Sequence, residues 1–182
     1  MAFKITNVKA TFFPSEEAVA SALNTFGLPA ERFGEALDGF VCSAPVVASR
    51  GYQQDLAAGL EAHLGSVAFG NGITVSWDRT YSEALNERAD VTFASNGHKQ
   101  RVFVEIEFRP NVEKDLVNFQ IGHNAGRLAA AILILACDRN EINAAYTTMP
   151  EFWKFVGVIR ELRPGYPLMV CGIGGEHMTG AP

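Results

Sequence analysis

The sequence lacks several features that mark secreted, metal-knuckle or membrane proteins. Its three cysteines, Cys42, Cys137 and Cys171, are too few for a disulfide framework and too far apart for a zinc knuckle. The longest apolar run, 128–137, is much shorter than the roughly 18 residues that a membrane helix needs. The N-terminal segment MAFKITNVKATFF lacks the charged-then-apolar layout of a signal peptide. We therefore expect a cytoplasmic protein with no membrane partner.

An excess of basic charge is also missing. The chain has 15 Lys and Arg against 20 Asp and Glu, so its net charge is −5, which argues against a protein that coats nucleic acid by charge alone. A nucleic-acid enzyme is not excluded, because a site that holds metal ions must itself be acidic. Hydrophobic residues make up 48% of the 182 residues, which excludes wholesale disorder. No repeat or low-complexity linker divides the chain, and its length predicts a single domain, 1–182.

Signals for secondary structure are weak in residues 1–50 and sharper afterwards. An alternating run over 3–13 predicts a strand, and Ser15 is a suitable N-cap for a helix that follows it. Glycines and prolines break up the rest of this region, so we expect an N-terminal appendage, 1–50, beside a core, 51–175. The core pattern predicts helix 52–64, strands 73–77, 88–94 and 100–108, helix 113–128, strand 130–137, helix 150–162 and strand 167–173. The expected fold class is α/β (α+β), a mixed β-sheet flanked by helices, with core order αβββαβ and an extra helix before the last strand.

Two of these strands flank an Asn-Gly pair at 96–97, the strongest short-range signal for a hairpin. With a two-residue loop there, Asp90 lies opposite Phe103. Because side chains alternate between faces, Asp90, Glu105 and Glu107 then share one face, and the other face is wholly apolar. Asp90 and Glu105 become diagonal neighbours, within reach of one shared cation.

The acidic face has two interpretations. As an ordinary strand face it would only be solvated, as in a structural or interaction protein. The following helix, however, offers a polar stripe at helical spacing, made of Gln120, His123, Asn124 and Arg127. Clustered carboxylates repel each other without a cation, and Mg²⁺ prefers one or two carboxylates with water and phosphate. The pattern therefore favours metal-assisted phosphodiester chemistry.

The segments RAD and VEIEF, which carry Asp90, Glu105 and Glu107, resemble the motif of the PD-(D/E)xK nuclease superfamily. Asp90 and Glu105 match its acidic residues. Glu107 stands where the motif has Lys, as in restriction endonucleases of the BamHI and BglII type, and Ala89 stands where the motif name has Pro. The resemblance covers 52–173 and implies a restriction-endonuclease-like fold.

The resemblance also implies a function: a Mg²⁺-dependent DNA endonuclease, of type II restriction type, that hydrolyses phosphodiester bonds. Asp90 and Glu105 would hold one or two Mg²⁺ ions, and Glu107 would orient or deprotonate the attacking water. A glutamate on the first core helix often completes the site in this family. Glu61 is the matching residue, with Glu83 and Glu87 as alternatives.

Double-stranded DNA is the expected partner, held by a homodimer whose two-fold symmetry mirrors a palindromic site. The residues expected to contact the substrate are Lys99, Arg101, Lys114, Gln120, His123 and Arg127. For the four Lys and Arg residues among them, solvated surface is an equally good explanation. Because the motif Lys is replaced, the alternative is a catalytically impaired nuclease-fold module that binds DNA or a protein partner.

Overall fold

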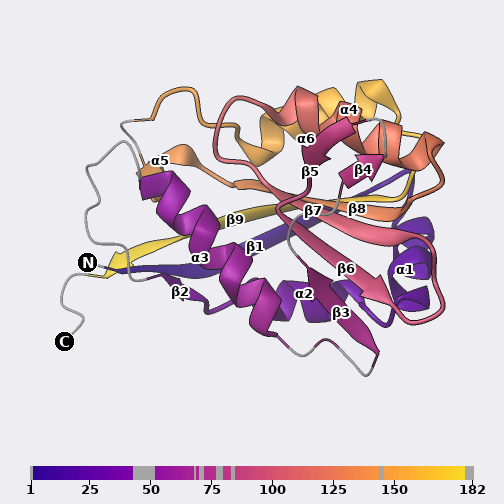
Figure 1. Ribbon diagram of the computed structural model, residues 1–182. Helices are drawn as coiled ribbons and strands as arrows, with labels where there is room; N and C mark the ends of the chain where they lie inside the picture. The colour runs from indigo at the N-terminus through magenta and orange to yellow at the C-terminus, as the bar shows by residue number, and fades with distance from the viewer. Residues whose placement is uncertain are drawn as a thin grey trace.

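The computed structural model describes residues 2–42, 52–67, 69, 72–76, 80–82, 85–143 and 146–178. Its centre is a seven-stranded mixed sheet (Figure 1). The strand order across the sheet is β2 (Val41–Cys42), β1 (Ala2–Phe13), β9 (Leu168–Met178), β8 (Leu128–Ala136), β7 (Arg101–Ile106), β6 (Val91–Ser95) and β3 (Ile73–Ser76). β7, β8 and β9 run parallel, and the other neighbours are antiparallel. Two short strands, β4 (Thr80–Ser82) and β5 (Leu85–Arg88), pair separately.

Helices cover both faces of the sheet (Figure 1). One face packs against α1 (Glu16–Thr25), α2 (Ala30–Leu37) and α3 (Tyr52–Ser66), and the other against α4 (Val112–Asn124) and α6 (Phe152–Leu162). A short helix, α5 (Arg139–Asn143), follows β8. The predicted fold class, a mixed sheet flanked by helices, is confirmed. No helix in the described residues is long and apolar enough to cross a membrane.

The alternation of β6 and β7 divides their side chains between two cores, as predicted. Val91, Val102 and Val104 lie in the larger core with Leu60 of α3, whereas Phe103 lies in the second core under α4 and α6. The next strand, β8, is buried at every position but Ala129, which is typical of a parallel strand covered on both faces.

The predicted N-terminal appendage contains β1, α1, α2 and β2, and its described residues belong to the sheet and the larger core. β1 pairs with β9 from Ala2 to Phe13. Ser15 caps α1, and its hydroxyl accepts a hydrogen bond from the Ala18 N–H at 3.2 Å. The sequence pattern missed α2, because Gly34 interrupts a helix whose buried side still contributes Phe33 to the core.

The predicted register of the hairpin is wrong by two residues. Phe103 pairs with Thr92 and not with Asp90, because β6 ends at Ser95 and β7 begins only at Arg101, which makes the connection longer than two residues. An even shift leaves every side chain on its predicted face. The shift also places Asp90, just before β6, beside Glu105 and no longer diagonal to it. This correction therefore strengthens the predicted proximity of the two carboxylates.

The predicted helix 113–128 is shorter in the structure. α4 ends at Asn124, and Gly126 follows with a φ of 68°, a left-handed conformation that stops the helix. Arg127 therefore lies beyond the helix and does not continue the polar stripe that was expected there. The structure also adds elements that were not predicted: β4, β5 and α5.

Candidate active site

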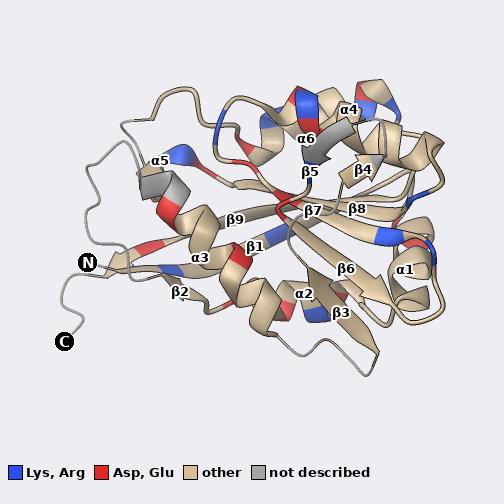
Figure 2. Ribbon diagram, viewed as in Figure 1, with Lys and Arg blue, Asp and Glu red and all other residues tan. Residues whose placement is uncertain are grey.

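Five carboxyl groups gather where β7 ends and α4 begins. They come from α3 (Glu61), the residue before β6 (Asp90), β7 and the residue after it (Glu105 and Glu107), and the first turn of α4 (Asp115). Each of the four other than Asp90 has a raised pKa, and the charge of Asp90 contributes to every one of these shifts. Figure 2 shows acidic segments at this end of β7 and in the first turn of α4.

Asp90 and Glu105 form the centre of the cluster. The Ile106 N–H donates a hydrogen bond to Asp90 Oδ2 at 2.8 Å, which fixes the Asp90 carboxylate against β7. Glu105 is only 7% exposed. Burial, followed by the charges of Asp90 and Asp115, raises the pKa of Glu105 to about 10. The structure therefore places these two carboxyl groups together, and with its raised pKa Glu105 keeps its proton at neutral pH.

Tyr81 of β4 is a residue of the site that the sequence pattern did not indicate. Its side chain is fully buried, and its hydroxyl donates a hydrogen bond to Glu105 Oε1. Burial, and then the neighbouring Glu105, raises the pKa of Tyr81 well above its ordinary value, so the hydroxyl stays a donor. No signal in the sequence points to Tyr81, because β4 is a short strand outside the main sheet.

Glu107, just after β7, is held by contacts with β8 and with Arg109. Its N–H donates to the Ile134 carbonyl at 3.0 Å, which ties the start of the loop to β8. Glu107 Oε1 accepts from the Arg109 N–H at 2.5 Å and lies 3.7 Å from Arg109 Nε. Burial raises the pKa of Glu107, and the contacts with Arg109 oppose that shift. Arg109 therefore provides a positive charge beside the Glu107 carboxylate.

Glu61 is brought to the cluster by α3, as predicted. Burial and the charge of Asp90 raise the pKa of Glu61 to about 7, while Arg109 acts in the opposite direction. Of the two alternatives for this role, Glu83 lies outside the described residues, and the side chain of Glu87 is not described. Of these three candidates, Glu61 is therefore the one whose side chain the structure describes, and its pKa is raised by the charge of Asp90.

Asp115 is a fifth carboxyl group that the sequence prediction missed. It is 6% exposed, and its Oδ2 has no hydrogen-bond partner. Burial raises its pKa to about 8, together with the charges of Glu107 and Asp90. A signal was available: Asp115 occupies an apolar-face position of its helix, between Val112 and Phe119, where a charged residue is rarely buried without a partner.

The predicted substrate contacts are divided among three places. Lys114 is next to Asp115, and its charge lowers the pKa of that residue. Arg101 and Arg127 lie where β7 and β8 begin, at the opposite end of these strands from the carboxyl groups. The Arg101 N–H donates a hydrogen bond of 2.8 Å to the Arg127 carbonyl. Glu105 lies four positions after Arg101 along β7, so their backbones are about 13 Å apart. Lys99 belongs to the same hairpin end.

The two remaining predicted contacts lie on the later turns of α4. Gln120 Nε2 donates to Asn124 Oδ1 at 2.9 Å, and the His123 ring lies 5.9 Å from the Tyr166 ring. Among the six predicted contacts, Lys114 alone is placed beside the carboxyl groups. The other five would meet a substrate only away from them.

The donor chemistry of the cluster fits a hard divalent cation. In the described residues, no group of three or more His, Cys, Asp or Glu side chains is arranged to hold a metal ion. Mg²⁺ needs only one or two carboxylates, however, and completes its shell with water and phosphate. Buried carboxyl groups with mutually raised pKa values, and the unpartnered Oδ2 of Asp115, are what a cation would neutralise.

Comparison with known proteins gives a structural match and no sequence match. No family model and no curated protein matches the sequence. Among solved structures, the chain is similar to one described as the crystal structure of free BglII, with a TM-score of 0.43 and 12% sequence identity. The match covers 96% of this chain and 82% of that chain. A likeness at this level transfers no residue roles to this chain.

Proposed function

We propose that this protein is a Mg²⁺-dependent DNA endonuclease of restriction type, which hydrolyses phosphodiester bonds. The observation that carries the proposal is the group of buried carboxyl groups around Asp90 and Glu105. Three of these groups, Glu105, Glu107 and Asp115, are buried and two, Glu61 and Asp90, are half-buried, and gathering them is costly unless a cation neutralises them. Hard oxygen donors of this kind suit the divalent cations that assist phosphoryl hydrolysis.

In the proposed mechanism, Asp90 and Glu105 would hold one or two Mg²⁺ ions. The bound cation would lower the pKa of a water and bind the oxygens of the scissile phosphate. Glu107 orients or deprotonates that water: Arg109 holds its Oε1, which leaves Oε2 for the proton. Glu61 completes the acidic shell, and Lys114 binds the phosphate backbone near the site.

Lys99, Arg101, Gln120, His123 and Arg127 are proposed to contact the DNA further from the scissile bond. Their place at the far end of the hairpin and on the later turns of α4 suits contacts that position the duplex, as most phosphate contacts do.

A homodimer is part of the proposal, because cutting both strands of a palindrome suits a two-fold assembly. α4 and α6 expose Val117, Val158 and Leu162, by 57%, 38% and 61%, beside a hollow of about 390 Å³. A second copy packed on these two helices would bury them. Sedimentation should give a dimer, and Val158→Glu should yield a monomer with an unchanged circular dichroism spectrum.

Plasmid cleavage tests the proposed activity. The wild-type chain should nick or linearise supercoiled DNA with Mg²⁺ and not with EDTA. Asp90→Asn and Glu105→Gln should abolish cleavage while the fold is retained, whereas Glu113→Gln, an exposed residue of the same acidic region, should cut at the wild-type rate. Cleavage at the wild-type rate by both site variants would mean that other residues do the chemistry.

A catalytically impaired module that binds DNA or a protein partner is the second candidate. Two contacts favour it: Tyr81 occupies an oxygen of Glu105, and Arg109 occupies an oxygen of Glu107. Ca²⁺-dependent DNA binding without any Mg²⁺-dependent cleavage would support this candidate. If calorimetry instead finds no divalent-ion binding, the acidic face would be an ordinary solvated surface of a structural or interaction protein.

A further inference from the structure

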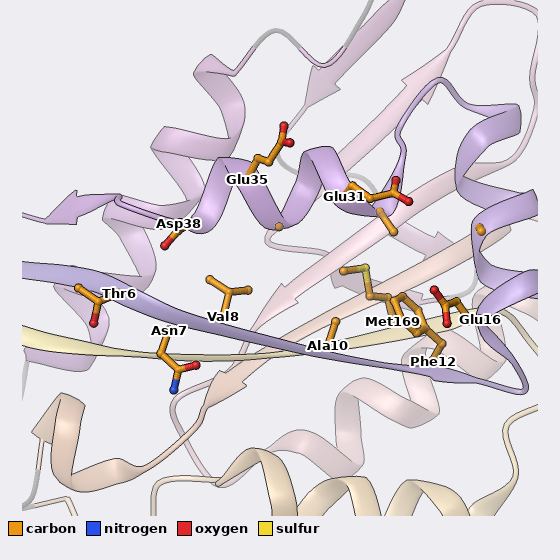
Figure 3. A pocket seen from close by; sticks show the side chains of 13 residues that line it. Thr6, Asn7, Val8, Ala10, Phe12, Glu16, Glu31, Glu35, Asp38 and Met169 are labelled. Carbon is orange, nitrogen blue, oxygen red and sulfur yellow. The ribbon is translucent and has the colours of Figure 1, made fainter.

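A groove lies on the sheet away from the carboxyl groups, between β1 and the helices α1 and α2. Its volume is about 530 Å³. Val8, Ala10 and Phe12 of β1 form an apolar floor together with Met169 of β9. Figure 3 shows α2 running alongside β1, with these side chains between them. Ala10 is exposed at the floor, so the groove is open to solvent.

One edge of β1 is unpaired along this groove. β9 pairs with β1 over its whole length, but on the other edge β2 pairs only with Phe3 and Lys4. Ile5 makes the last hydrogen bonds on that edge, with Phe40 and Gly39. In the described part of the chain, no strand pairs with that edge from residue 6 to residue 13. Such an edge offers backbone donors and acceptors to another extended segment.

Basic residues often block strand edges of this kind, and here they do not. Lys9, the basic residue in the middle of β1, is turned to the other face of the sheet, where its Nζ lies 5.1 Å from the centre of the Trp153 ring. Among the described residues that line the groove, none is Lys or Arg. The edge and the groove floor are therefore accessible together.

The charges around the groove are all of one sign. Glu16 of α1, Glu31 and Glu35 of α2, and Asp38 just after α2 are exposed and line it. An occupant with basic residues would complement them. A second copy of this chain would not, because two such edges meeting would bring the four acidic groups of each copy together.

From this combination we propose that the groove between β1 and α2 binds an extended basic peptide segment of a partner protein. The segment adds a strand to the free edge of β1, so main-chain hydrogen bonds provide affinity. Its alternate side chains point into the groove, where apolar ones meet Val8 and Phe12, and its basic ones meet the acidic rim. This site is independent of the carboxyl groups around Asp90.

Fluorescence anisotropy with a labelled peptide of the repeat Lys-Ser-Val-Ser, measured in EDTA, tests the proposal, because this spacing places Lys and Val on the same face of an extended strand. The wild-type chain should bind it, and a peptide of the repeat Glu-Ser-Val-Ser should not bind. The double variant Glu31→Lys with Glu35→Lys should bind on the order of tenfold more weakly or worse, because it turns attraction into repulsion. The matched control, Glu17→Lys with Glu161→Lys, makes the same change of net charge at exposed residues outside the groove and should bind as the wild type does.

Two further measurements separate strand addition from simple charge attraction. A peptide of the same charge, methylated at alternate backbone nitrogens, should lose binding because it cannot donate to β1. Ala10→Trp should fill the groove and also abolish binding. Three results would overturn the proposal: the wild type does not bind the peptide, the methylated peptide binds as well as the unmodified one, or both double variants lose the same amount of affinity. Unchanged binding by Glu105→Gln would confirm that the peptide does not use the carboxyl cluster, whether or not the protein cuts DNA.

Discussion

At the scale of single residues, the site is governed by carboxyl groups that are buried without enough positive charge. Asp115 is the simplest of them, because it is buried and its Oδ2 has no partner. Its pKa rises from 3.8 to about 8 on folding in the absence of metal. Between these two values the folded chain keeps a proton that the unfolded chain has released.

Asp115→Asn should therefore change the pH dependence of stability. In the wild type, this group makes the free energy of unfolding fall as pH rises from about 4 to about 8 and leaves it level above that range. Asn carries no such proton. In EDTA, the stability of Asp115→Asn relative to the wild type should rise through this window, measured by urea unfolding at several pH values. A difference that stays constant from pH 4 to pH 9 would contradict the prediction, and exposed Asp138→Asn should serve as the control.

Tyr81→Phe tests whether the hydroxyl on Glu105 competes with a cation. Removing it leaves Glu105 Oε1 without its donor, so a cation should gain what the hydroxyl provided. A hydrogen bond to a neutral carboxyl group contributes about 0.5–1.5 kcal/mol, which corresponds to an increase of up to about tenfold in affinity. Calorimetric titration with Mn²⁺ or Ca²⁺ measures this increase. Weaker binding by Tyr81→Phe would mean that Tyr81 supports the cation site and does not compete with it.

Sequence reasoning reached Asp90, Glu105 and Glu107 through strand alternation and a short motif, both of which are local patterns, and it reached Glu61 through the family resemblance. It missed Tyr81 and Asp115 for different reasons. Tyr81 depends on where a small separate sheet docks, which no local pattern encodes. Asp115 broke the apolar pattern of α4, and that break was itself the missed signal.

At the scale of secondary-structure elements, β1 and β9 approach so closely that only glycine fits at one point. A Cβ atom at Gly175 would collide with the backbone carbonyl oxygen of Lys4. Backbone atoms cannot rotate away as a side chain can, so the strands themselves would have to move apart. The contact is therefore a sensitive probe of this strand pair.

Gly175→Ala should destabilise the protein by about 1–3 kcal/mol, the usual cost of overpacking. Gly165→Ala is the matched control, because a Cβ there meets nothing within 4 Å, and it should be close to neutral. Thermal unfolding of both variants measures the difference. Equal melting temperatures for the two variants would mean that β1 and β9 adjust without cost.

The elements themselves were predicted well where a periodic pattern ran unbroken, as in β8 and α6. The hairpin was predicted on the correct faces but in the wrong register, because the length of its connection depends on where pairing stops and not on the Asn-Gly pair alone. α2 was missed because a glycine in mid-helix, Gly34, reads as a break when packing is not considered.

At the scale of the whole molecule, an acidic chain must bind DNA through local charge. The net charge is −5, and two bound Mg²⁺ ions would add four positive charges, which leaves −1. DNA affinity should therefore rise when Ca²⁺ is added. It should also fall as monovalent salt increases, because Lys and Arg contacts to phosphates exchange with counterions. Filter binding over a range of both ions measures these slopes, and an affinity independent of both would remove the basis for a DNA substrate.

The pairing of β1 with β9 joins residues 2–13 to residues 168–178. A contact between segments so far apart in the chain has a high loop-closure cost and forms slowly. On the ribosome, β1 must wait, unpaired, until the segment that forms β9 has emerged. During that interval the edge that later meets β9 is exposed, as is most of the edge of which β2 covers only the first residues. We expect this strand to be the part of the nascent chain that depends most on chaperones.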